Sequence, residues 1–96
     1  MFSYENQKPS NEYTVYFGSA PGRISMYSDG IVIRNGKRDT PVRSNYVEQV
    51  TRLAGDALLG KVSVELSYFD MFGNREAVEV RMRENDYRAL KKDLGK

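Results

Sequence analysis

Residues 61–83 read KVSVELSYFDMFGNREAVEVRMR, and this stretch decides the fold of the chain. From residue 62 to 68, Val, Leu and Tyr alternate with Ser and Glu, which is the period-two pattern of a half-buried strand. The same alternation returns from residue 78 to 82, after a polar turn in which Gly73 supplies the positive φ of a short hairpin loop. The stretch therefore predicts an antiparallel hairpin with one core face and one solvent face.

The register of this hairpin follows from where the turn closes. If it closes between Asp70 and Asn74, the apolar side chains of the two strands fall on one face. Two glutamates then oppose each other on the other face, and Arg81 on the diagonal is expected to relieve their repulsion. The predicted opposite pairs are Leu66 with Val78, Val64 with Val80, Glu65 with Glu79, and Phe69 with Arg75.

The residues before this hairpin predict a meander of short strands. Turn signals rich in Gly, Pro, Asn and Asp separate segments of β-branched, aromatic and aliphatic residues. Asn35-Gly36 is the strongest two-residue hairpin signal. Pro41 has no N–H to donate, which places its strand at an edge of the sheet. The predicted strands are 13–17, 23–27, 31–34 and 37–43, and the predicted turns are 19–22, 28–30 and 35–36.

Residues 44–60 fit two interpretations. As a helix, the segment carries an apolar stripe at Tyr46, Val50, Leu53 and Ala57. As a strand, it runs from residue 46 to 53 and leads into a Gly-containing loop. The β-branched residues disfavour a helix mildly, so we expect the extended form. The fold class follows from this choice: mainly β with a C-terminal helix in a small antiparallel barrel, or an α+β two-layer sandwich with a helix at about 45–58.

The C-terminal segment predicts an amphipathic helix. Asn85 is the expected N-cap, and Gly95 is expected to end the helix. A helix of about ten residues does not persist alone in water, so it must dock on the sheet. The expected core cluster comprises Val64, Leu66, Val78, Val80, Tyr87, Leu90 and Leu94.

Composition limits the chemistry. The 96 residues are enough for one domain, expected over 13–96 behind a flexible tail at 1–12. The chain has no Cys and no His, so disulfides, zinc sites and the usual acyl-transfer triads cannot be built. The carboxylates are scattered, and no membrane span or signal peptide is visible. We therefore expect a non-enzymatic cytoplasmic protein with no metal and no cofactor.

Several short stretches, spread over residues 13–94, have a characteristic order and spacing. They are Ile24-Ser25-Met26 followed by Asp29-Gly30-Ile31, Pro41-Val42 followed by Val47-x-x-Val50, Val62-x-Val64-x-Leu66, Val78-x-Val80 and the final helix. Together they resemble small prokaryotic pleckstrin-homology-like domains, which implies a small barrel capped by the helix. The turn at 19–22 lacks the paired basic residues with which phosphoinositide-binding members hold a lipid phosphate, so the resemblance does not extend to lipid recognition.

Two candidate binding surfaces remain. Phe69, Met71 and Phe72 surround the central hairpin turn, and exposed aromatic residues at a loop tip are typical anchors for a partner. They predict a protein-interaction module or small subunit that binds another protein or a second copy of itself. The alternative is nucleic-acid or other polyanion binding through the basic hairpin 34–43 and the arginines of 75–83. Its candidate residues are Arg34, Lys37, Arg38, Arg43, Arg75, Arg81 and Arg83.

Overall fold

The computed structural model describes residue 4 and residues 6–55 and 60–96. In this part of the chain, seven strands form one antiparallel sheet and a single α-helix follows them. The elements are β1 (Asn11–Phe17), β2 (Ala20–Met26), β3 (Gly30–Asn35), β4 (Arg38–Arg43), the 3-10 turn η1 (Ser44–Tyr46), β5 (Val47–Arg52), β6 (Lys61–Phe69), β7 (Arg75–Arg83) and α1 (Glu84–Leu94).

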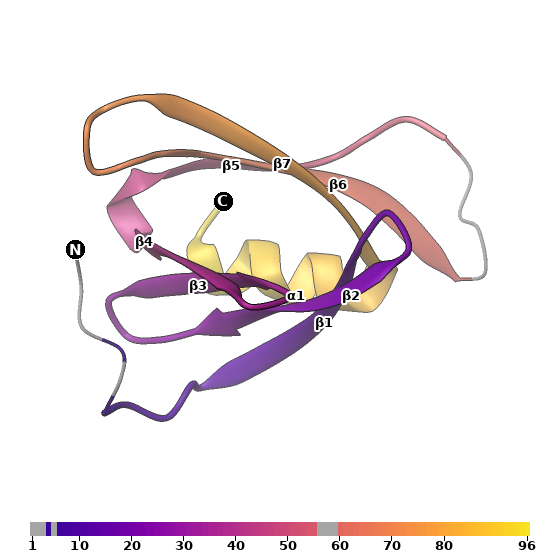
Figure 1. Ribbon diagram of the computed structural model, residues 1–96. Coiled ribbons are helices and arrows are strands. Elements are labelled where there is room, and N and C mark those ends of the chain that lie inside the picture. The colour runs from indigo at the N-terminus through magenta and orange to yellow at the C-terminus, as the bar shows by residue number, and fades with distance from the viewer. Residues whose placement is uncertain (1–3, 5, 56–59) are drawn as a thin grey trace.

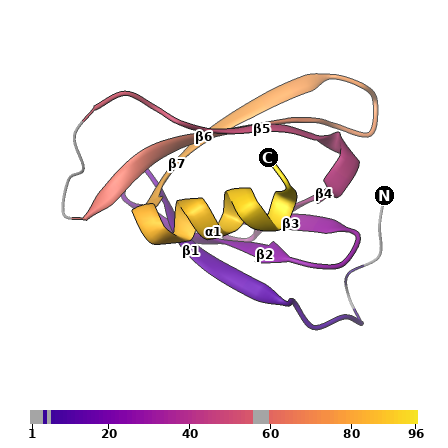
Figure 2. The same cartoon turned by 180° about the vertical axis from the view of Figure 1, so that it is seen from behind.

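The strands lie in the order β4-β3-β2-β1-β7-β6-β5, so the sheet is open and its two edges are β4 and β5. Pro41 therefore lies on an edge strand, as its missing N–H predicts. The sheet bends so that β1 to β4 and β5 to β7 form two facing layers (Figure 1). Seen from behind, α1 lies across the opening between these layers (Figure 2). The mainly β fold with a C-terminal helix is confirmed.

The core fills the space between the two layers. Leu66 and Val64 are fully buried there with Leu90 of α1, and Val78 and Tyr87 pack against the same cluster. Val80 is also a buried member of this cluster and Leu94 packs against it, so all seven residues expected in the core lie in or against one cluster. The alternation of residues 62–68 thus sets which face of β6 is buried.

The register of the β6–β7 hairpin is also confirmed. All four predicted pairs occur, and the Asp70 N–H donates to the Asn74 carbonyl at 2.9 Å. Glu65 and Glu79 are directly opposite each other, but no ion pair links Glu65 to Arg81 among the described residues. The Nε of Arg81 is instead buried and has no hydrogen-bond partner within that part of the chain.

Residues 47–52 form a strand, which confirms the extended interpretation. The alternative helix at about 45–58 is wrong for the described residues of that range, and residues 56–58 lie outside the described part of the chain. The apolar residues of this segment have a helix-like spacing because of a local irregularity in the strand. β5 contains a bulge between Val47 and Gln49, which shifts the register by one residue. Val47 and Val50 therefore both face the core although they are three residues apart, a spacing that also fits a helix face.

Two turns differ from the prediction. β2 begins at Ala20, and the chain turns at Gly18 and Ser19 rather than over 19–22. Pro21 is tolerated in β2 because β3 pairs with β2 only from Gly22 onward, so no ladder bond to β3 is lost. The turn between β3 and β4 is centred on Gly36 and Lys37, one residue later than Asn35-Gly36 predicts.

The ends of α1 and β1 agree only in part with the prediction. Arg83 is the N-cap of α1 and makes no side-chain capping bond, so the prediction of Asn85 is wrong. Gly95 ends the helix with a φ of 70°, as expected. β1 begins at Asn11, two residues earlier than predicted. The hydroxyl of Tyr13 on β1 donates to Asp93 at 2.5 Å and joins the end of α1 to the sheet.

Candidate functional site

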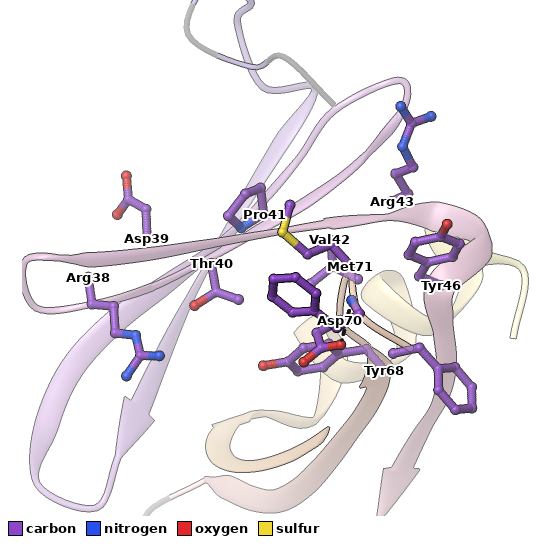
Figure 3. A pocket seen from close by; sticks show the side chains of 12 residues that line it. Arg38, Asp39, Thr40, Pro41, Val42, Arg43, Tyr46, Tyr68, Asp70 and Met71 are labelled. Carbon is purple, nitrogen blue, oxygen red and sulfur yellow. Dashed lines mark hydrogen bonds between the residues drawn. The ribbon is translucent and has the colours of Figure 1, made fainter. Parts of the chain in front are cut away.

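A pocket of about 430 Å³ lies between edge strand β4 and the turn that joins β6 to β7 (Figure 3). The turn of the central hairpin and the edge of the meander, far apart in the sequence, thus share one site. Most of its lining side chains are apolar or aromatic. The lining residues are Arg38, Asp39, Thr40, Pro41, Val42, Arg43, Tyr46, Tyr68, Phe69, Asp70, Met71 and Phe72.

The turn is held rigid by Asp70. One carboxylate oxygen accepts from the backbone N–H of Phe72 at 2.9 Å and of Asn74 at 2.8 Å, and the other accepts from the Asn74 side chain at 3.3 Å. The backbone bond from Asn74 is the main cause that holds the pKa of Asp70 below its ordinary value, with the bond from Phe72 acting in the same direction. Gly73 has a φ of 83° and completes the loop.

This turn presents apolar side chains to solvent. The exposed fractions are 37% for Phe69, 59% for Met71 and 81% for Phe72. Tyr46 in η1, at 41%, is the remaining exposed large hydrophobic residue among the described residues. All four line the pocket. The exposed apolar surface of the described chain is therefore concentrated at one site, which is the arrangement expected of a contact surface.

The opposite wall of the pocket is the unpaired side of β4. The bond from the Ser44 N–H to the Asp29 carbonyl shows that even-numbered residues of this segment direct their backbone groups toward β3. The backbone groups of Asp39, Pro41 and Arg43 therefore point to the free edge, because bonding direction alternates along a strand. Pro41 contributes no N–H, which interrupts the row of donors and discourages uncontrolled edge pairing.

Arg38, Thr40 and Tyr68 lie on one side of β4, whereas Asp39 and Arg43 lie on the other side (Figure 3). Burial raises the pKa of the Tyr68 hydroxyl, and the negative charge of Glu76 acts in the same direction. The positive charge of Arg38 opposes that rise, so the guanidinium acts electrostatically on this hydroxyl. The negative charge of Asp70 acts in the same direction as that of Glu76, so this end of the pocket is polar and carries charges of both signs, with Arg38 as its cation.

The basic residues predicted for polyanion binding divide into separate places. Arg38 and Arg43 line the pocket from opposite faces of β4, and Lys37 lies exposed in the β3–β4 turn. The guanidinium of Arg34 donates to the Tyr27 hydroxyl at 3.1 Å and its Nε is buried. The hairpin 34–43 thus presents its charges in several directions.

The three arginines of β7 also lie apart from one another. Arg75 begins the strand and bonds Glu48 through its Nε at 2.6 Å. Arg83 ends the same strand eight residues later, roughly 27 Å away at the rise of an extended chain. Arg81 lies opposite Ser63 and Tyr16 and is partly buried. Residues 75–83 therefore do not form one basic patch.

Sequence reasoning identified Phe69, Met71 and Phe72 but missed Tyr46, Tyr68 and the wall formed by β4. Tyr68 belongs to the inward register of β6, which marks it as a core residue in any pattern-based analysis. Its position at the end of the strand, where the two layers open, leaves it only half-buried. No sequence signal locates β4 beside this turn, because sheet curvature brings the two together.

The Asp70 contacts lead to a prediction. Replacing Asp70 with Ala removes the three hydrogen bonds that its carboxylate accepts and is expected to lower the melting temperature at neutral pH. The carboxylate has a depressed pKa in the folded state, so its contribution is present above the unfolded pKa of about 4 and is lost as the pH falls through the folded value. The melting temperatures of the unmodified protein and of Asp70→Ala should therefore become equal in acid. A difference between the two melting temperatures that stays constant from pH 7 to pH 2 would contradict this account.

No group of three or more carboxylates is placed to hold a metal ion in the described part of the chain, and its one helix is too short and too polar to cross a membrane. Comparison with protein-family models and with curated proteins finds no match to this chain. The pocket between β4 and the β6–β7 turn is therefore identified from its own geometry.

Proposed function

We propose that this protein is a non-enzymatic interaction module, or a small subunit, that binds another protein or a second copy of itself through the pocket between β4 and the β6–β7 turn. One observation carries the proposal: the four exposed large hydrophobic residues of the described chain all line this pocket. Exposed aromatic side chains around a concave surface supply most of the energy of typical protein interfaces.

The rigidity of the turn supports the same proposal. The hydrogen bonds of Asp70 hold the backbone on which Met71 and Phe72 are presented, so little conformational freedom is left to lose on binding. Neither Phe69 nor Phe72 belongs to the core cluster, which leaves their rings available for contact. Exposed aromatic side chains that lie outside the core and gather at one site are typical anchors for a partner.

Nucleic-acid or polyanion binding is the weaker function. Its seven candidate residues are spread over β3, the β3–β4 turn, both faces of β4 and the length of β7, and Arg75 is already paired with Glu48. Binding to a phosphate backbone needs several cations that contact the same strand at once. A protein-binding pocket requires no such alignment.

A pleckstrin-homology-like assignment remains part of the proposal. Seven antiparallel strands followed by one C-terminal helix is the element order that the resemblance implies, and α1 across the opening between the layers is consistent with a helical cap. The open sheet, with β4 and β5 unpaired to each other, departs from a closed barrel. Such domains serve as interaction modules, in agreement with the function proposed here.

The test replaces Phe69 and Phe72 together with Ser. Because both rings lie outside the core cluster, we expect a nearly unchanged melting temperature. We also expect weaker self-association in sedimentation velocity, or loss of the proteins that the unmodified domain retains from a native extract.

A matched control replaces Thr51 and Ala77, both exposed and outside the pocket, with Ser. This control should behave like the unmodified protein in both assays. If the Phe69→Ser/Phe72→Ser protein keeps its self-association and its retained proteins, the pocket is not the binding surface. If it unfolds, the two rings stabilise the fold and the proposal also fails.

A further inference from the structure

The pocket contains a positive charge without an ionic partner. No ion pair among the described residues includes Arg38 or Arg43, the two arginines that line the pocket, and Arg38 is the one on the same side of β4 as Tyr68. Arg38 nevertheless lines a mainly apolar pocket and acts electrostatically on the Tyr68 hydroxyl. A guanidinium in such surroundings is available to a negatively charged group from outside.

Neither acid that lines the pocket, nor Glu76, whose charge also acts on the Tyr68 hydroxyl, forms an ion pair with Arg38 among the described residues. The carboxylate of Asp70 accepts three hydrogen bonds from its own turn and is oriented by them. Asp39 lies on the other side of β4, directly opposite Arg34 on β3. Cross-strand neighbours of opposite charge interact favourably, so Asp39 has a basic neighbour of its own.

The polar end of the pocket has the chemistry of a carboxylate site. Beside the Arg38 guanidinium lie two residues with hydroxyl groups, Thr40 and Tyr68 (Figure 3). Guanidinium and hydroxyl donors together satisfy the several lone pairs of a carboxylate, and charge-assisted bonds of this kind are the strong ones. The rest of the lining offers the exposed apolar surface of Phe69, Met71 and Phe72.

We propose that the pocket binds a segment of a partner protein in which an acidic side chain stands close to a bulky apolar one. The acidic side chain pairs with Arg38, and the apolar side chain packs against Met71 and Phe72. A peptide is favoured over a free small molecule because the pocket continues along the free edge of β4, where the Asp39 and Arg43 N–H groups face outward. This inference rests on the proposed function and specifies the partner's chemistry.

The experiment uses capped hexapeptides in which one Glu and one Phe, Leu or Tyr are placed next to each other or one residue apart, in a Gly/Ser background. Each peptide has a Gln counterpart and a counterpart with Ser in place of the apolar residue. Binding to the full chain is followed by amide shifts in NMR titrations. We expect at least one Glu peptide to shift signals of 38–43 and 68–72, and to bind about tenfold more tightly than its Gln counterpart.

Arg38→Glu is expected to abolish the preference for Glu over Gln. Lys37→Glu is the matched control, because it makes the same charge change at the neighbouring residue without touching the pocket, and it should keep the preference. The inference is wrong if no peptide of the panel binds, if Glu and Gln peptides bind equally, if the shifts map elsewhere, or if both variants lose the preference alike.

Failure of this inference is distinguishable from failure of the proposed function. If the Phe69→Ser/Phe72→Ser protein loses partners that Arg38→Glu retains at full strength, the pocket is the binding surface but its partner is not acidic. If the double variant retains every partner, the proposed function is wrong. The inference about an acidic partner segment, which depends on that function, is then wrong as well.

Discussion

Replacing Leu90 with Ala is expected to lower the free energy of unfolding by about 2–5 kcal/mol. Leu90 is fully buried and is the one residue of α1 that is completely enclosed in the core. Its removal leaves a cavity between the helix and the two layers, which neighbouring side chains fill only in part. This loss is a large share of the stability of a small domain. Urea or thermal denaturation measures it directly.

Lys92→Ala is the control for this experiment. Lys92 is exposed on the same helix, and Ala is at least as good a helix former, so the change should stay within about 0.5 kcal/mol. A loss below that size for Leu90→Ala would mean that α1 is not docked on the sheet in solution, and the arrangement across the opening would then be incorrect.

Replacing Gly22 with Ala is expected to destabilise the protein by about 1–3 kcal/mol. A Cβ at this position would stand 2.5 Å from the Arg34 carbonyl oxygen and even closer to the ring of Phe17. The ring can shift, but the carbonyl belongs to the backbone of β3 and moves only with the strand. The position therefore requires Gly for close packing and not for an unusual φ.

A double-mutant cycle with Phe17→Leu separates the two contacts. The smaller side chain frees space near the new methyl group, so Gly22→Ala should cost less in the Leu background than in the unmodified protein. Part of the cost should remain because the carbonyl is still in place. If Gly22→Ala raises stability, as reduced freedom of the unfolded chain alone would predict, then β2 and β3 are not as closely packed as described.

The hairpin of 61–83 was predictable because its information is local. Side chains alternate with period two, and one buried face excludes a shift by one residue, which would turn every apolar side chain to solvent. Strand type, register and turn closure all followed from this pattern. The identity of the β5 segment was harder to infer, since the bulge at Glu48 gives Val47 and Val50 a three-residue spacing that a helix would also show.

The turn between β1 and β2 could not be located for a related reason. Ser19 to Gly22 contains Pro and Gly, which are typical turn residues, yet the chain turns at Gly18 and Ser19. Pro21 is accommodated because β3 does not extend to its level, and Gly22 is needed for close packing. Both reasons depend on a third strand, so a local pattern does not contain them.

The sequence by itself determined the strands and helix that carry the core, and it identified Phe69, Met71 and Phe72 as the exposed apolar residues of the hairpin turn. Only the tertiary structure decided that β4 and Tyr46 lie beside that turn, and that Tyr68 lines the pocket between them, with Arg38 at its polar end. The physical reason is the distance along the sequence over which each effect acts. Periodicity reports which face of an element is buried, whereas the bend of the sheet decides which distant elements meet.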